Sequence, residues 1–312
     1  MLRYIKQIGL GVLAIVVVLV AVILVKTLTF ASKQVVVSSQ VSYPIDMDQA
    51  AARLGKALQL QTVSDTTEGQ SVDWSQFTQF QQYLEKSFPL VHSTLDKKVI
   101  NNCGLLYVWK GSDPQKKPIF LTGHYDVKPA SDADAGWKYP PFSGVVSDGY
   151  IWGRGAVDDK ATPMGLMEAT EYLIKNDYKP TRSIYMGFGC DEENGGALGA
   201  AKMAEYLKST GVQFEVIIDE GGFVTRGLIP GIPESQWVAL VGTGEKGVVY
   251  LELTAETPGG HSSVPERWTS VGILAAALDK IESNPFPTRW PTPTQDTFDY
   301  LGPEMSYPNK LI

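Results

Sequence analysis

Acidic residues gather in four loops of this sequence, and one of the loops also carries a histidine. The loops read TGHYDV, WGRGAVDDK, GCDEEN and DEGG. Their carboxylate and imidazole side chains are those of His124, Asp126, Asp158, Asp159, Asp191, Glu192, Glu193, Asp219 and Glu220. Carboxylates that lie close together repel one another unless a cation lies between them. Because zinc binds imidazole nitrogen together with carboxylate oxygen, this set of side chains predicts a zinc site.

Each of these side chains has an ordinary structural interpretation when it is taken alone. A single histidine such as His124 is usually structural. Asp158 and Asp159 could cap a following helix. Glu192 and Glu193 could lie in a solvated loop. Three of the four loops, however, directly follow an apolar segment of strand length, and this coincidence favours the metal site.

The elements that would position the loops alternate between strands and helices. Strand patterns cover residues 119–121, 183–188 and 214–218, and helical spacing covers residues 163–176 and 197–209. Such alternation is typical of a mainly parallel sheet with helices on its faces. The carboxyl ends of parallel strands meet at one edge, where ligands bind. We therefore expect an α/β fold that carries the site at that edge.

Further elements are expected before and after this region. The earlier part of the chain predicts two helices and a strand, at residues 47–60, 75–88 and 105–110. Beyond Gly242, residues 247–254 alternate like a half-exposed antiparallel strand, and residues 270–282 have helical spacing. We predict a catalytic zinc domain over residues 46–241 and an inserted, incomplete α+β lid domain over residues 242–312.

The first 30 residues are far more apolar than the rest. Residues 9–25 read GLGVLAIVVVLVAVILV, with basic residues on both sides. Such a run is just long enough to span a bilayer, and the basic N-terminus would stay cytoplasmic. We expect a signal anchor over residues 1–30 and a stalk over residues 31–45. The catalytic part would then lie outside the cytosol, in the periplasm, the extracellular space or a lumen. A cleaved signal peptide, which would give a secreted protein, and a buried core helix stay open.

Composition gives weaker constraints. The chain has 312 residues and a net charge of -7, and its basic residues are not clustered. Nucleic-acid binding needs clustered Lys and Arg, so no nucleic-acid partner is expected. The only two cysteines are Cys103 and Cys190. Because Cys190 lies beside the acidic run of its loop, we expect two buried free thiols rather than a disulfide.

Five motifs follow one another in the sequence: GHYDVKPA, GWKYPPFSGVVSDGYIWGRGAVDDK, CDEENGG, IDEGG and GGHSS. In this order they resemble the family of cocatalytic dizinc peptidases that includes aminoacylase and carboxypeptidase S. The likeness extends to secreted enzymes that hydrolyse and form N-fatty-acyl amino acids. It covers residues 45–312.

The resemblance implies a set of metal ligands, namely His124, Asp158, Glu193 and Asp219. Each complete subunit would bind two zinc ions, which share Asp158 as a bridge. His124 and Asp219 would complete the first site, and Glu193 would belong to the second. The family takes a further histidine for the second ion from near the end of a longer chain. Only His92 and His261 remain here, and His92 matches no motif. We therefore expect a part of a longer protein, or a truncated pseudo-enzyme.

The resemblance also implies the groups that would act in the reaction. Glu192 would be the general base. Asp126 would hold the His124 ring through its second nitrogen. His261 would reach the active site of a neighbouring subunit in a homodimer formed by the lid domain, although a surface histidine is an alternative.

The implied function is zinc-dependent hydrolysis of an amide bond next to a free amino-acid carboxylate. The substrates would be N-acyl amino acids or small peptides. Two alternatives stay open. One is a related metal aminopeptidase or deacylase, and the other is a non-catalytic, membrane-tethered binding module.

Overall fold

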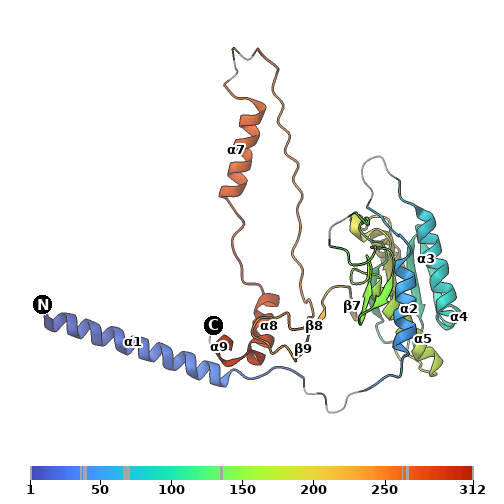
Figure 1. The fold of residues 1–312 in the computed structure, drawn as a ribbon, viewed down its shortest axis with the longest axis horizontal. Coiled ribbons are helices and arrows are strands. Elements are labelled where there is room, and N and C mark those ends of the chain that lie inside the picture. Colours follow the sequence, from blue (N-terminus) through green and yellow to red (C-terminus); the bar gives the residue numbers. More distant parts are fainter. Residues whose placement is uncertain are drawn as a thin grey trace. The chain divides into compact units, whose positions relative to one another are not determined.

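A computed structural model of the chain describes residues 2–35, 37, 41–65, 71–133, 136–261, 263–264 and 267–310 (Figure 1). The chain divides into two units. One is Gln40–Glu220, and the other combines Met1–Ser39 with Gly221–Ile312. All the candidate metal ligands lie in the first unit. The predicted domain limits at residues 46, 241 and 242 stay a prediction.

Five strands form the central sheet of Gln40–Glu220, in the order β1-β2-β6-β3-β7. They are β1 (Asp96–Ile100), β2 (Gly104–Trp109), β3 (Ile119–His124), β6 (Ile184–Gly189) and β7 (Val216–Ile218). Strand β3 is parallel to β6 and β7, and β2 is antiparallel to β1 and β6. Four of these five strands therefore point one way, which confirms the mainly parallel α/β sheet. The carboxyl ends of β3, β6 and β7 meet at one edge.

Four helices of this unit confirm the sequence patterns: α2 (Met47–Leu58), α3 (Trp74–Ser87), α5 (Ala161–Lys175) and α6 (Ala200–Thr210). A fifth, α4 (Pro89–Thr94), was not predicted. Side chains that cap free backbone N–H groups explain two of the helix starts. Asp46 accepts from Gln49 at the start of α2, and Asp73 accepts from Ser75 at the start of α3. Helix α6 ends at Gly211, whose φ of 73° suits glycine.

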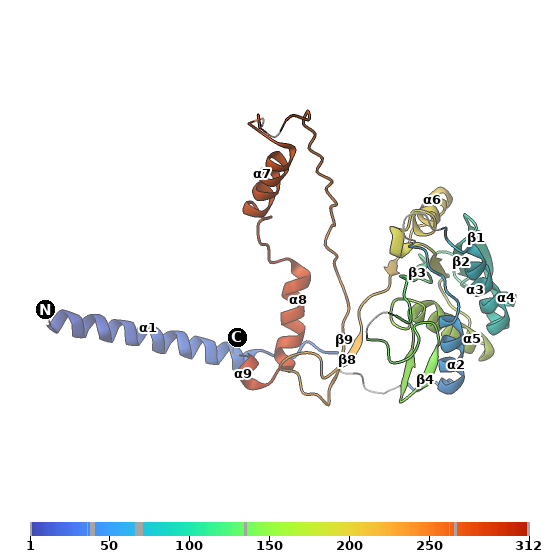
Figure 2. The ribbon, with the colours of Figure 1, turned by 45° about the horizontal axis from the view of Figure 1, so that its top comes forward.

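Alternating side chains of β2 show how both faces of the sheet are covered. Leu105 and Tyr107 join a core cluster with residues of α3, α4 and α5. Leu106, on the opposite face, packs in a cluster with Met203 of α6. Because successive side chains of a strand point to opposite faces, one strand contributes to both cores. Figure 2 shows α6 separated from α3, α4 and α5 about the sheet.

A short hairpin follows the His124 loop and was not predicted. It consists of β4 (Val145–Ser147) and β5 (Tyr150–Trp152). Asp148 and Gly149 form its turn, with φ of 56° and 80°. Two residues with positive φ are typical of a tight hairpin turn, and Asp-Gly is a favoured pair there.

The two cysteines form a disulfide, so the expectation of free thiols was wrong. Antiparallel pairing of β2 with β6 explains the bond. The register that pairs Leu105 with Phe188 places Cys103 opposite Cys190, two residues beyond this last pair of the ladder. Their Cα atoms are 5.7 Å apart, which is a usual separation for bonded cysteines. The disulfide depends on the pairing of two strands that are distant in the sequence, so no local sequence pattern predicts it.

The second unit contains the long helix α1 (Leu2–Thr29) and several short elements. The short elements are β8 (Val224–Arg226), β9 (Trp237–Ala239), α7 (Ser270–Ser283), α8 (Thr292–Leu301), η2 (Gly302–Glu304) and α9 (Tyr307–Lys310). Helix α7 confirms the helix predicted at residues 270–282. The strand predicted at residues 247–254 was wrong, since this segment has no strand and Tyr250 is 93% exposed. A strand needs a partner for its backbone, and no described segment pairs with this one.

Helix α1 carries the apolar N-terminal run. Within the described residues it alone is long and apolar enough to cross a membrane, with a mean hydropathy of 3.4 over its best window in Tyr4–Thr29. A signal sequence would have the same properties, so this helix is compatible with both the anchor and the cleaved form.

Candidate metal centre

His124 is the last residue of β3, and its ring is buried. Its Nδ1 atom lies 3.0 Å from the backbone carbonyl oxygen of Asp126 and 3.2 Å from Oδ1 of the same residue. Both of these oxygens are hydrogen-bond acceptors, so Nδ1 carries a proton. The opposite ring atom, Nε2, is thereby aimed at the loops at the carboxyl edge of the sheet.

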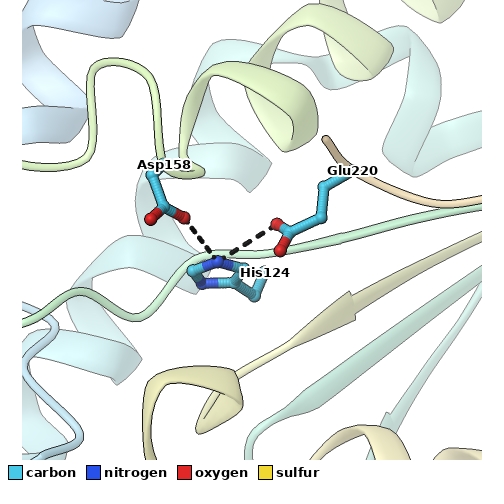
Figure 3. Close-up of side chains that lie close together, drawn as sticks. All are labelled: His124, Asp158 and Glu220. Atoms are coloured by element: carbon cyan, nitrogen blue, oxygen red, sulfur yellow. Dashed lines mark hydrogen bonds and ion pairs between the residues drawn. The ribbon is translucent and has the colours of Figure 1, made fainter. Parts of the chain in front are cut away.

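Three carboxylates surround Nε2. Oδ1 of Asp158 is 3.0 Å away, Oε2 of Glu220 is 3.1 Å away, and Oε2 of Glu192 is 3.7 Å away. Figure 3 shows Asp158 and Glu220 pointing at the ring from two different segments. The loops that follow β3, β6 and β7 therefore converge with the Asp158 loop, as the sequence pattern predicts.

These carboxylates change the titration of the ring. Burial alone would lower the pKa of His124, but hydrogen bonds and charges from Asp126 and Glu220 raise the pKa to about 11. The neighbourhood of Nε2 thus strongly favours a positive charge. A proton supplies that charge in the absence of a metal ion, and a divalent cation would replace it.

Asp126 connects the histidine to the glutamate loop. Its carboxylate is fully buried and accepts hydrogen bonds from Oγ of Ser64 and from the backbone N–H groups of Glu192 and Glu193. Burial by itself would raise the pKa of Asp126, but the bonds from His124 and Ser64 bring it below its ordinary value. Asp126 is therefore an ionised anchor that fixes the ring and the glutamate backbone together.

Asp159 is a buried carboxyl group that interacts with Glu220. Its buried carboxylate accepts hydrogen bonds from the backbone N–H of His124 and from Oγ1 of Thr162. Burial and the contact with Glu220 raise the pKa of Asp159 to about 7. Burial by itself would raise the pKa of Glu220, but its interactions with His124 and Asp159 lower it. The two carboxyl groups are thus shifted in opposite directions, and the Glu220 carboxylate faces the ring. The peptide bond between Asp158 and Asp159 is cis.

Glu192 and Glu193 start a short 3-10 turn after β6, η1 (Glu192–Asn194). Burial is the main cause that raises the pKa of both residues. The charge of Glu220 adds to this effect at Glu192, where His124 opposes it, and the charge of Asp158 adds to it at Glu193, where Lys128 opposes it. The Glu192 side chain is 53% exposed, so it can exchange protons with solvent.

Lys128 is bound to the Glu193 side of the loop. Its Nζ atom donates to the backbone carbonyl of Glu193 and to Oδ2 of Asp65 at 3.0 Å, and lies 3.6 Å from Oε2 of Glu193. The hydrogen bond with Asp65 is the main reason why the pKa of Lys128 is raised. This ammonium partly balances the negative charge on Glu193.

The donor set fits a divalent metal ion. One ligand atom each from His124, Asp158 and Glu220 can be chosen so that all lie within 4.8 Å of one another. Oε2 of Glu220 is buried and makes no hydrogen bond of good geometry within the described residues, although it is 3.1 Å from Nε2. Two atoms this close without a well-aligned bond can both face a common cation. One nitrogen with carboxylate oxygens is a set that zinc accepts.

Comparison with known sequences identifies the family. Residues 120–300 match Peptidase family M20/M25/M40, which is more than half of the 312 residues. The chain belongs to this peptidase family. The matched range contains all four loops of the candidate metal centre.

Named relatives of this M20-family chain agree with the resemblance drawn from its motifs. It is 41% identical over 270 residues to "Probable carboxypeptidase S-like 2" of Dictyostelium discoideum, covering 85% of this chain and 51% of the relative. It is 42% identical over 267 residues to "N-fatty-acyl-amino acid synthase/hydrolase PM20D1" of Xenopus tropicalis, covering 85% and 51%. It is 36% identical over 252 residues to "Carboxypeptidase S" of Saccharomyces cerevisiae, covering 78% and 43%. The chain thus spans about half the length of the curated relatives it matches.

The structure of this M20-family chain brings some predicted residues together and leaves others apart. Asp126, Asp158 and Glu192 lie around the ring of His124, as expected. Glu193, the neighbour of Glu192, contacts Lys128. Asp219 is exposed, and its Oδ1 atom accepts the backbone N–H of Glu220. The carboxylate that faces His124 comes from Glu220 instead. The assignment of Asp219 as a ligand stays a prediction.

Sequence reasoning had named Glu220 as an acidic loop residue but gave it no role. Adjacent residues of an extended chain point in opposite directions, so only one of Asp219 and Glu220 can face the ring in one conformation. His261 lies in the other unit, where it is exposed and its Nδ1 atom is 2.7 Å from Oγ of Ser263. Its role in a partner's active site and the homodimer stay predictions.

Proposed function

We propose that this chain carries the zinc-binding half of an amidohydrolase that cleaves amide bonds next to a free amino-acid carboxylate. The observation that supports it is the buried His124 ring, whose Nε2 atom is surrounded by Asp158, Glu220 and Glu192. His124 and Asp158 would hold the first zinc ion together with a carboxylate from the pair Asp219 and Glu220. Asp158 would also reach a second ion beside Glu193.

Each side chain then has a distinct task. Zinc, when bound, would make a water molecule more acidic and polarise the carbonyl of the substrate. Glu192, with its raised pKa and its open position, accepts the proton of the attacking water and delivers it to the departing amide nitrogen. Asp126 keeps the ring and the glutamate loop in register.

The names of the relatives support the substrate class. A carboxypeptidase and an N-fatty-acyl-amino acid hydrolase both act on a bond whose product is an amino acid with a free carboxylate. We extend that class to this protein. The protein would then hydrolyse N-acyl amino acids and C-terminal peptide bonds, and it would not remove residues from the N-terminus of a peptide.

Replacing the proposed base tests the reaction. The variant Glu192→Gln should keep its zinc and lower kcat by about 100- to 10,000-fold, since it can no longer take a proton. Zinc content and hydrolysis of N-acyl amino acids would be measured on the same preparation, with Glu85→Gln as a surface control. Full turnover in Glu192→Gln would rule out this base. Zinc binding without turnover in the wild-type chain would favour the binding-module alternative.

The third ligand of the first ion can be assigned by a pair of matched variants. Because Glu220 faces His124, we expect Glu220→Gln to lower the zinc affinity by about ten- to 100-fold. Asp219 is exposed, so Asp219→Asn should change the zinc affinity little. Equilibrium dialysis with zinc would measure both. The reverse order would mean that the end of β7 turns over when zinc binds and that Asp219 is the ligand.

The location proposed for this protein is outside the cytosol. The apolar helix α1 would act as a signal anchor, or as a cleaved signal in a secreted form. The Cys103–Cys190 disulfide supports this, since structural disulfides persist in oxidising compartments. Protease protection of the chain in sealed vesicles would test it, because an external catalytic part resists protease added on the cytoplasmic side.

A further inference from the structure

Lys160 is a buried amine that has no part in the reaction described above. It directly follows Asp158 and Asp159 and precedes the first turn of α5. The whole residue is 0% exposed. Its Nζ atom donates hydrogen bonds to the backbone carbonyl of Ala57 at 3.1 Å and to that of Leu60. A buried amine without acceptors would be costly, so these two bonds fix where the side chain can end.

One acceptor, the carbonyl of Ala57, lies in the last turn of α2 (Met47–Leu58), and the other, that of Leu60, lies two residues beyond the helix. The last carbonyls of a helix have no partner within the helix, and the helix dipole favours a donor or positive group there. We name residues 57–64 the α2 exit segment. The Lys160 side chain therefore ties the loop that carries Asp158 to the α2 exit segment. Either protonation state of the amine can donate both hydrogen bonds.

The same segment also supports the histidine loop. The backbone carbonyl of Thr62 accepts the N–H of Val127 at 2.9 Å, and Oγ1 of Thr62 donates to the carbonyl of Tyr125 at 2.5 Å. Oγ of Ser64 donates to the Asp126 carboxylate at 2.5 Å. Tyr125, Asp126 and Val127, which follow His124, are thus all hydrogen-bonded to the α2 exit segment. The same segment therefore holds both the His124 loop and, through Lys160, the Asp158 loop.

We propose that Lys160 is a positioning residue, which sets the 3.0 Å approach of Asp158 to Nε2 of His124 by holding the Asp158 loop against the α2 exit segment. Asp158 needs such a restraint because its own side chain is 67% exposed and contacts the ring only at its tip. The inference rests on the proposed metal centre. In this proposal Lys160 sets the distance between Asp158 and His124 and does not contact the substrate.

Lysine-to-methionine substitution tests the role, since methionine fills a similar volume without a donor. In the full chain in detergent, Lys160→Met should lower zinc affinity by at least about tenfold, in line with other groups that orient metal ligands. The visible absorption spectrum of the cobalt-loaded protein should change, because the ligand geometry changes. Lys160→Arg, which keeps donors, should recover part of the affinity.

The control is Lys97→Met, which removes a lysine of β1 whose side chain is 18% exposed and whose Nζ atom pairs with Glu85, the only carboxylate it contacts among the described residues. It should bind zinc and cobalt as the wild type does. If Lys160→Met does not fold, Lys160→Gln keeps a donor on a shorter side chain, and its zinc affinity should be lower than that of Lys160→Arg.

The outcomes separate the two proposals. A folded Lys160→Met or Lys160→Gln protein with wild-type zinc affinity and cobalt spectrum would overturn the positioning role and leave the metal centre intact. A loss of thermal stability in the metal-free form with unchanged affinity would show a purely structural role and overturn it as well. A wild-type chain that binds no zinc would overturn the proposed function, and this inference with it.

Discussion

In Gln40–Glu220, strand β2 has apolar side chains buried on both faces, whereas in Gly221–Ile312 the apolar residues 247–254 are exposed. Both segments have β-forming composition. They differ in whether other parts of the described chain supply partners. Helices α3, α5 and α6 cover β2, and β1 and β6 bond its backbone. A strand pattern therefore becomes a strand only where neighbours complete it.

The same contrast holds for charged groups. Around His124 the carboxylates are held by several donors each, and Asp126 is 0% exposed. In the other unit, Lys33 and Asp299 form an ion pair at 2.5 Å, with side chains 46% and 49% exposed. Water screens such a surface pair, while the buried network is hardly screened. The candidate metal centre thus lies in the unit where polar groups are buried and paired.

Matched asparagine substitutions would sharpen this comparison and should give the largest effect. Asp126→Asn leaves buried donors without a charged acceptor and should destabilise the first unit by about 3 kcal/mol. Asp299→Asn removes an exposed partner and should leave stability unchanged. Guanidinium denaturation of the metal-free chain in detergent, followed by tryptophan fluorescence, would measure both. Equal effects of the two substitutions would break the comparison.

A change of pH should have a smaller effect, which acts in opposite directions on stability and on zinc affinity. The folded pKa of His124, about 11, lies above its ordinary value of 6.5. The stability that its charge contributes is therefore complete below pH 6.5 and is lost as pH rises through about 11. Zinc must displace the same proton, so its apparent affinity should rise about tenfold per pH unit between pH 6.5 and 8.

Calorimetry in buffers of different ionisation enthalpy would check this by counting released protons. About one proton should leave Nε2 per zinc ion at pH 7. The variant His124→Gln is the control, and it should lose the pH dependence together with most of the affinity. Binding of zinc to the wild type without proton release would contradict the charge balance described for the ring.

Local patterns were enough for much of the first unit. The apolar runs predicted β3, β6 and β7, and helical spacing predicted α5 and α6 within a few residues. The Asp148–Gly149 turn signal was present but was not used, so the β4–β5 hairpin was missed. The disulfide and the contact of Glu220 with His124 depend on strand register and on the direction of a side chain after β7. Neither property is encoded locally.

The most direct test of the account is zinc binding by the full chain, measured by dialysis and elemental analysis beside His124→Ala and the control variant His92→Ala. His92 is half-buried, and its ring nitrogens contact the carbonyl of Phe88 and the hydroxyl of Tyr107. The account predicts at least one tightly bound zinc ion per chain in the wild type and in His92→Ala, and none in His124→Ala. Equal zinc content in all three proteins, or no zinc in any, would contradict it.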